Sequence, residues 1–161
     1  MAKEDKMFVG IDPSYKSTGL IILDKDGELV KEMNFSVNDH EEIEEKLLEF
    51  EETIKFIPSI VRLQSVFIEG PSYMSNGKFV LQMGALHFLL RVFLFRHEIP
   101  FKVIAPNTLK KFVTGNGHAK KDLMLLKVYK KWGVEFEIDD LADAYGLARM
   151  ALEEYQKWVT T

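Results

Sequence analysis

The sequence predicts an α/β fold: one mixed five-stranded sheet, its first three strands antiparallel, with helices on both faces. Two observations predict it. Three closely spaced apolar runs open the chain, and Asp26-Gly27 between the second and the third is a strong hairpin signal. Beyond residue 38, helical patterns separate the remaining apolar runs, so the later strands should lie parallel to the first.

Each element has its own signal along the chain. Strands are expected at residues 7–12, 18–24, from the turn to about Phe35, 64–69 and 101–105. Helices are expected at 39–57, 78–97, 106–112, 119–131 and 138–158. In the first helix, apolar residues step by 4, 3, 4 and 3 from Ile43 to Ile57, with Asn38 or Asp39 as the N-cap. Pro106 can open the third helix at its first turn.

Composition is typical of a soluble globular chain, and 161 residues suit a single domain over 1–161. The absence of cysteine excludes disulfides, thiolate zinc sites and cysteine nucleophiles. The polar first six residues lack the apolar core of a signal peptide, so a cytoplasmic location is expected. The most apolar stretch is 79–95, but Gln82, His87 and Arg91 interrupt it, and no membrane association is expected.

Charge is unevenly distributed along the chain, although the net value is only −4. Residues 38–52 hold eight acids and one base, whereas residues 101–131 hold eight lysines and one acid, Asp122. A chain polarised in this way can bind a polyanion on one face. The same lysines could equally form an ordinary solvated surface, since lysine is common there.

Four acids stand where acids are structurally awkward. Asp12 and Glu69 each end an apolar run, at the carboxyl ends of strands that should be parallel. Asp140 and Asp143 lie three apart on one face of the last helix. A turn opener and a favourable helix N-terminus are the simpler explanations for Asp12 and Asp140. Buried carboxylates need a partner, and converging carboxylates suit Mg²⁺ or Mn²⁺. Two such ions would stabilise the entering and leaving oxygens of a phosphoryl displacement.

Four motifs occur in order along the chain: Gly10-Ile11-Asp12-Pro13-Ser14 with Thr18-Gly19, Ile68-Glu69-Gly70-Pro71, the stretch 113–121, and 140–144. Together they resemble the RuvC-type Holliday junction resolvases, in particular the bacteriophage branch, over about residues 7–152. The resemblance implies an RNase H-like fold and a homodimer that cuts opposed strands of four-way DNA junctions, and of related branched DNA such as forks.

The resemblance also implies residue roles. Asp12, Glu69, Asp140 and Asp143 match the metal-binding acids, and Lys120 or Lys121 matches a basic position at the scissile region. Tyr73 or Met74 lies nearest to an aromatic wedge position. The residues expected to contact DNA are Lys110, Lys111, Asn116, His118, Lys120, Lys121, Lys127, Tyr73 and Met74. As plain loop residues, Asn116 and His118 would be equally ordinary.

Stretch 78–97 is apolar nearly all round, so one face can cover the sheet and the surplus needs another cover. A second copy is the expected cover, with Leu81, Gly84, Ala85 and Phe88 at the dimer interface. Burial beneath the last helix is the alternative.

Three other functions remain open from the sequence. A nuclease of the same fold could act on RNA or RNA–DNA hybrids. The first motif also resembles the phosphate loop of actin-like ATPase modules, although these need two such domains and the chain provides one. A junction-binding protein without catalysis is the third, and the intact set of acids opposes it.

Overall fold

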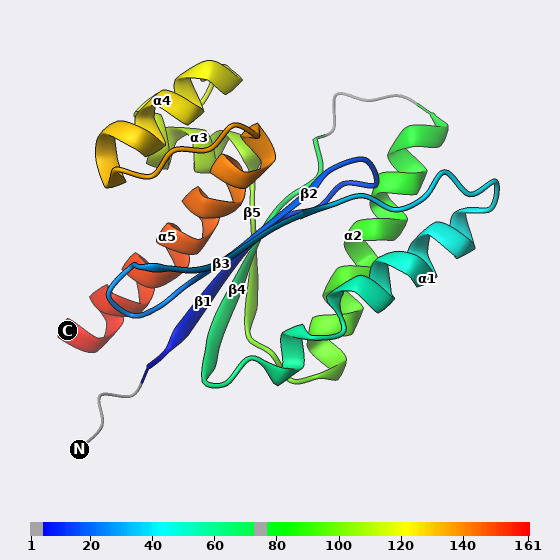
Figure 1. Cartoon of the computed structure of the whole chain (residues 1–161), viewed down its shortest axis with the longest axis horizontal. Helices are drawn as coiled ribbons and strands as arrows, with labels where there is room; N and C mark the ends of the chain where they lie inside the picture. The colour runs from blue at the N-terminus through cyan, green and yellow to red at the C-terminus, as the bar shows by residue number, and fades with distance from the viewer. Residues whose placement is uncertain (1–4, 73–76) are drawn as a thin grey trace.

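The computed structural model describes residues 5–72 and 77–161, and these form a mixed five-stranded sheet with helices on both faces (Figure 1). The sheet order is β3-β2-β1-β4-β5. The strands are β1 (Met7–Asp12), β2 (Thr18–Leu23), β3 (Leu29–Phe35), β4 (Leu63–Glu69) and β5 (Phe101–Ile104). The fold predicted from the sequence is confirmed, including the antiparallel pairing of the first three strands.

Strand direction brings the two strand-end acids to one edge of the sheet. β1 pairs with β2 in antiparallel fashion, with Asp12 opposite Gly19. β4 runs parallel to β1, with Ile11 opposite Ile68, and β5 runs parallel to β4. Because parallel strands end at the same edge, Asp12 and Glu69 leave the sheet side by side.

The helices match the expected order with shifted ends: α1 (Ile43–Ile54), α2 (Lys78–Arg96), α3 (Pro106–Thr114), α4 (Lys121–Trp132) and α5 (Asp139–Thr160), with a short 3₁₀ helix at Ile57–Ser59. The expected N-cap of the first helix was wrong. α1 begins four residues later, after Glu42, without a side-chain cap. Asn38 and Asp39 instead contact side chains of α1. The Glu49 carboxylate accepts a hydrogen bond from the Asn38 backbone, and the Lys46 ammonium donates one to Asp39 at 2.9 Å.

Two hydrophobic cores lie on opposite faces of the sheet (Figure 1). One joins the α5 face to α3 and α4 and includes Phe8, Ile21 and Tyr145. The other joins α1 and α2 to the opposite face and includes Val9 and Leu90. Alternate residues of β1, such as Phe8 and Val9, therefore serve different cores, as the pleat of a strand requires.

α2 buries only one side. Leu86, Leu90 and Leu94 pack into the core, whereas Leu81, Phe88 and Phe95 are exposed to 76%, 61% and 79%. Burial beneath the last helix, the alternative from the sequence, was wrong, because α5 covers the other face. Within the described ranges, α2 is also the one helix long and apolar enough to cross a membrane. A helix packed on a sheet meets the same criteria, so this alone does not indicate a membrane.

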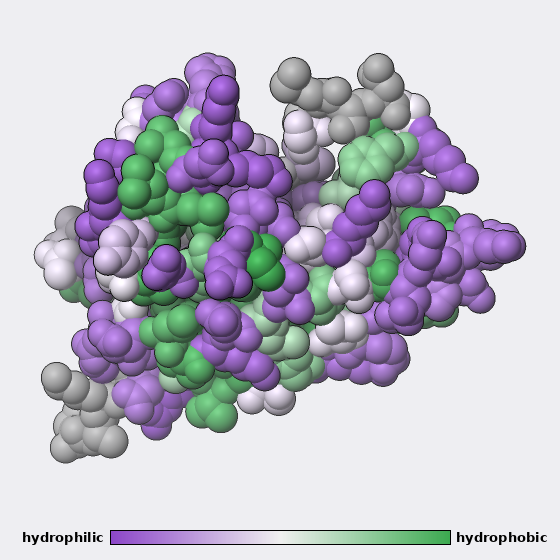
Figure 2. All heavy atoms as spheres, turned by 45° about the horizontal axis from the view of Figure 1, so that its top comes forward, coloured by the Kyte–Doolittle hydropathy of each residue, from purple (hydrophilic) through white to green (hydrophobic). Residues whose placement is uncertain are grey.

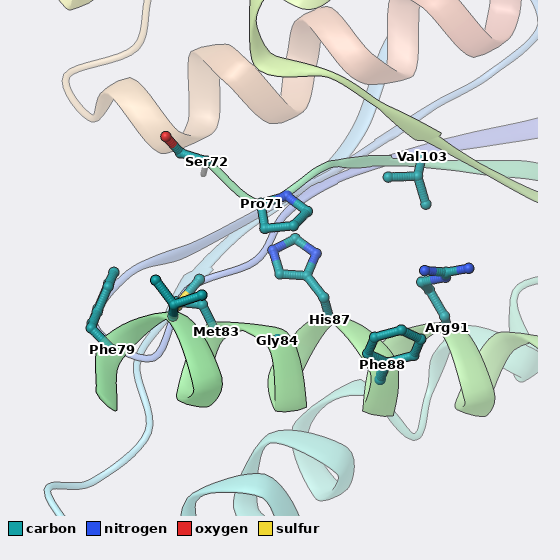
Figure 3. A pocket seen from close by; sticks show the side chains of 10 residues that line it. Pro71, Ser72, Phe79, Met83, Gly84, His87, Phe88, Arg91 and Val103 are labelled. Atoms are coloured by element: carbon teal, nitrogen blue, oxygen red, sulfur yellow. The ribbon is translucent and has the colours of Figure 1, made fainter. Parts of the chain in front are cut away.

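A cavity of about 330 Å³ lies beside α2, between this helix and the segment that follows β4. Figure 3 shows Pro71 above it, His87 and Arg91 rising from α2, and Val103 of β5 on the far side. The His87 imidazole is buried, and its Nδ1 has no hydrogen-bond partner in the part of the chain that the structure describes. This side of the molecule is therefore less completely packed than the α5 side.

Candidate active site

Three carboxylates from three elements converge at the carboxyl edge of the sheet. Asp12 is the last residue of β1, Glu69 is the last residue of β4, and Asp143 lies in the second turn of α5. One oxygen from each of these partly buried carboxylates lies within 4.8 Å of the other two. Residues separated by more than 130 positions thus share one small volume, which is the convergence that the sequence predicted.

Close contact between α5 and the sheet produces this convergence. A Cβ atom on Gly19 would lie 2.1 Å from the backbone oxygen of Asp140, and one on Gly10 would lie 1.9 Å from that of Ala144. Any larger residue at either position would push the helix away from the sheet. Because Gly19 pairs with Asp12, its missing side chain lets the start of α5 lie directly beside Asp12.

Burial and mutual repulsion disfavour the charged forms of these acids. Burial raises the pKa of Asp12 well above its usual value, and repulsion by Glu69 and Asp143 raises it further. Burial, with repulsion by Asp143, raises the pKa of Glu69 to about 8. Burial and nearby Asp139 raise the pKa of Asp143 to about 7. The cluster consists only of carboxylate oxygens, which are the ligands that Mg²⁺ and Mn²⁺ prefer. A divalent cation would allow all three to be ionised.

Asp140 lies next to this cluster but is not part of it. Among the described residues, the group that could hold one ion includes Asp12, Glu69 and Asp143 without Asp140. Its charge nevertheless raises the pKa of all three carboxyl groups, so it borders the same volume. Its predicted role as a metal ligand remains a prediction, and the geometry distinguishes it from the other three.

Two lysines face the acids, and the sequence singled out only one of them for the scissile region. Lys110 of α3 and Lys121 of α4 both lower the pKa of Glu69 and of Asp143. Lys121 also forms an ion pair with Asp139, which raises the pKa of the lysine. Lys120 is the exposed N-cap residue of α4. Of the two lysines matched to the scissile region, Lys121 is the one whose charge acts on these acids. Lys110, predicted only as a DNA contact, acts on them as well, and Asp139 had no predicted role at the site.

The remaining predicted DNA contacts lie at the surface near α3. Asn116 and His118 belong to an open depression of about 630 Å³, together with Lys111 and the start of α3. The Asn116 side chain accepts a hydrogen bond from the His118 backbone at 3.0 Å, which holds the loop in a fixed turn. Tyr73 and Met74 lie outside the described residues.

Comparison with known proteins gives consistent results. The family model described as crossover junction endodeoxyribonuclease RuvC matches residues 8–150. The protein of that name from Sulfurovum sp. (strain NBC37-1) is 30% identical over 145 residues, covering 87% of this chain and 91% of the relative. Its counterpart from Rickettsia conorii is 27% identical over 156 residues, covering 91% and 96%.

Solved structures show the same fold. Thermus thermophilus RuvC superposes with a TM-score of 0.76 at 20% identity, covering 96% of this chain and 97% of that structure. T. thermophilus RuvC in complex with a Holliday junction substrate superposes with a TM-score of 0.77 at 19% identity, covering 97% of both chains. At these low sequence identities the superpositions establish the fold alone. The family is established by the family model and by the relatives named above.

Proposed function

The chain belongs to the RuvC family of crossover junction endodeoxyribonucleases, and we propose that it is a metal-dependent nuclease that cuts four-way DNA junctions and other branched DNA. The observation that supports this most directly is the convergence of Asp12, Glu69 and Asp143. Residues 1–161 would form a single nuclease domain, and the enzyme would act in the cytoplasm. The relatives compared above are bacterial, so the bacteriophage branch remains a prediction.

The acids would hold the metal. Asp12, Glu69 and Asp143 are close enough together to share one cation, and Asp140 beside them provides a carboxylate toward a second. Mg²⁺ is the expected ion, and Mn²⁺ fits the same donors. Two bound ions would supply positive charge that stabilises the entering and leaving oxygens of phosphodiester hydrolysis.

The protein itself would place the phosphate. Lys110 and Lys121 bring positive charge to the edge of an otherwise acidic site, where a phosphodiester would otherwise be repelled. Asp139 holds Lys121 through its ion pair, so the lysine is oriented before DNA arrives. The backbone of a bound strand would then lie between the acids on one side and the two lysines on the other.

Branched DNA would be recognised through its backbone. The proposed contacts, which carry phosphate-binding or polar side chains on α3, α4 and the loop between them, are Lys110, Lys111, Asn116, His118, Lys120, Lys121 and Lys127. Such contacts position a duplex without reading its sequence. A junction-bound RuvC of the same fold is consistent with this partner.

A homodimer would complete the enzyme. Leu81, Phe88 and Phe95 are spaced seven residues apart on the exposed side of α2, the spacing of a helix–helix seam. Gly84 and Ala85 lie between them, and a Cβ on Gly84 would meet nothing within 4 Å, so a partner helix could approach closely. Two copies related by a two-fold axis would present two acid sites to opposed strands.

The Asp143→Asn substitution tests the proposal. We expect cleavage of a synthetic four-way junction in Mg²⁺ to fall by more than about a hundredfold, because loss of a mere outer-shell partner typically costs about 10- to 100-fold. Junction binding should persist, since the change removes negative charge. Asp39→Asn is the matched control, because Asp39 is exposed and, among the described residues, forms its ion pair with Lys46 of α1, away from the three converging acids. Undiminished cutting by Asp143→Asn would refute its role as a ligand.

Substrate class needs a separate measurement. An RNA–DNA hybrid and a four-way DNA junction of equal length should compete for the wild-type enzyme. Preferential cutting of the junction supports the proposed function, whereas preferential cutting of the hybrid would assign the same acid site to a different nuclease.

A further inference from the structure

A basic cavity lies at the surface of α3 and α4, and none of the three converging acids lines it. Its volume is about 360 Å³, and it is lined by Lys111, Lys127, Lys130, Lys131 and the last turn of α3 from Phe112 to Gly115. Figure 2 shows hydrophilic side chains over this part of the molecule, at the upper left of the view, around a hydrophobic strip. We call it the distal basic cavity.

The positive charge of the distal basic cavity is not neutralised by the protein. No residue that lines it is acidic. Within residues 5–72 and 77–161, none of its four lysines forms an ion pair, whereas lysines elsewhere, such as Lys46, Lys102 and Lys121, each pair with an acid. Four cations around one concave surface raise the local concentration of anions and favour a polyanion.

Specific contacts fix part of the cavity wall, which distinguishes the cavity from a loose group of surface lysines. Lys131 donates a hydrogen bond to the Phe112 backbone oxygen at 3.0 Å. Its Nζ also lies 4.9 Å from the centroids of both the Phe112 and the Trp132 rings, which stack on each other. Lys131 is therefore held in place, and Lys111, Lys127 and Lys130 remain available for an anion.

Position relates the cavity to the proposed nuclease site. α4 begins at Lys121, which pairs with Asp139 beside the acids, and Lys130 follows nine residues later. At the helical rise this is about 14 Å, which corresponds to about four base pairs along a duplex. α4 also lies at the opposite end of the molecule from α2, the helix assigned to the dimer (Figure 1). DNA leaving the dimer axis across the acids would therefore pass over α4.

We propose that the distal basic cavity binds the phosphate backbone of a junction arm, about four base pairs from the scissile phosphate. This rests on the proposed function, because the arm must start at the acid site. The cavity would act as a second point of attachment that fixes the direction of the arm. An acidic protein segment is the competing occupant, and the experiment below separates the two.

The test is the double variant Lys127→Gln/Lys130→Gln, whose sites lie on one face of α4. Junction affinity should fall about tenfold at physiological salt, and the slope of log affinity against log salt should become shallower by about two, near 0.9 for each lost phosphate contact. The matched control is Lys55→Gln/Lys157→Gln, two exposed lysines outside the cavity, one directly after α1 and one in the last turn of α5. This control should keep both the affinity and the slope of the wild type.

Uncharged DNA linkages locate the contact along the arm. Methylphosphonate linkages placed about four base pairs from the cut should weaken binding of the wild type and should weaken the double variant no further, because partners in direct contact are not additive. Equal losses in both proteins, or an unchanged salt slope, would overturn the proposal and leave the cavity to another anion. If the wild type cuts junctions all the same, the proposed function survives that result. If the wild type neither binds nor cuts junctions, both proposals fall.

Discussion

The two helical layers of the molecule differ in how completely they are packed. On the α5 layer, most of the helix from Leu141 to Leu152 is buried, and two glycines of the sheet allow backbone-to-backbone approach. On the α2 layer, half of the helix faces outward with large apolar side chains, a cavity of about 330 Å³ remains, and one buried imidazole nitrogen has no partner among the described residues. One layer is closed, and the other is open.

The difference follows from what each layer has to do. Carboxylates that share a cation must be held within a few tenths of an ångström, which needs a rigid support. The closed layer provides it, because α5 cannot shift toward or away from Asp12 without breaking its contacts at Gly10 and Gly19. The open layer has no such task within one chain. The apolar side chains exposed on α2 are removed from water only when another surface covers them.

Gly19→Ala should have the largest effect, because it opens the closed layer at the acids. The added methyl would lie 2.1 Å from the Asp140 backbone oxygen, so the start of α5 must move. We expect a loss of at least about 3 kcal/mol in the free energy of unfolding, since overpacking against backbone is costly. Cleavage should fall by more than about a hundredfold. Denaturant melts and junction cleavage measure the two effects.

Gly146→Ala is the matched control for this prediction. It also adds a methyl to the α5 layer, but the nearest atoms are the side-chain ends of Val113 at 2.8 Å and Leu109 at 2.9 Å, which can move. A cost of about 1 kcal/mol with retained cleavage is expected. Equal damage from both substitutions would show that the contact at Gly19 has no special part in positioning the acids.

Phe88→Asp should break the open layer without unfolding the chain. Phe88 is exposed and lies at the centre of the α2 seam, so a charge there costs little in the monomer. In a dimer it would bury an unpaired charge in an apolar contact, which we expect to weaken association by about 2–4 kcal/mol. Sedimentation at several concentrations measures the change. Leu48→Asp adds the same charge at an apolar side chain of α1 that is exposed to a similar extent, and it serves as the control. A monomeric wild type would contradict the proposed interface.

The fold was predictable because its signals are local. The turn at Asp26-Gly27, the apolar runs and the alternation with helices predict the strand directions, and parallel strands must end at one edge. An acid at the end of each of two such strands then predicts that the two side chains lie close together, as Asp12 and Glu69 do. Family motifs added the activity, which the comparison confirmed at the level of the family.

Details of the site depend on contacts that no local pattern encodes. By spacing, Asp140 and Asp143 lie on the same face of the helix. The close approach of the α5 backbone to the sheet at Gly10 and Gly19 is what places Asp143 beside the other carboxylates. Lys110 lies near enough to Glu69 to lower its pKa because α3 follows β5, which runs parallel to β4 and ends at the same edge of the sheet. The start of α1 was misplaced for a different and local reason, since Asp39 binds Lys46 instead of capping the helix.

A pH scan of the metal-free protein measures how strongly the buried acids of the α5 layer resist ionisation. The raised pKa of Glu69, about 8, and of Asp143, about 7, means that the folded state holds protons that the unfolded state has lost. Stability should therefore be highest at about pH 4, where the carboxyl groups of the unfolded chain begin to ionise, and should fall by at least about 2 kcal/mol as pH rises to about 8. Asp12→Asn should flatten this dependence, and Mg²⁺ should raise the melting temperature most at high pH. A flat profile for the metal-free wild type would show that neither burial nor mutual repulsion raises the pKa values of these acids.

His87→Met gives the smallest expected effect and addresses the open layer. Burial, aided by Arg91, lowers the pKa of His87 to about 4, so the imidazole is neutral at pH 7 and its Nδ1 lies buried beside the cavity of Figure 3. Methionine fills a similar volume without that polar atom, so the free energy of unfolding should rise by about 1 kcal/mol. The gain should grow as pH falls from 6.5 toward 4, because the wild type there loses stability to protonation of unfolded His87. Leu86→Met, at a fully buried neighbour on α2, should give no gain at any pH. A loss from His87→Met would mean that the imidazole has a partner in solution, and a second copy seated on α2 is the nearest surface that could provide one.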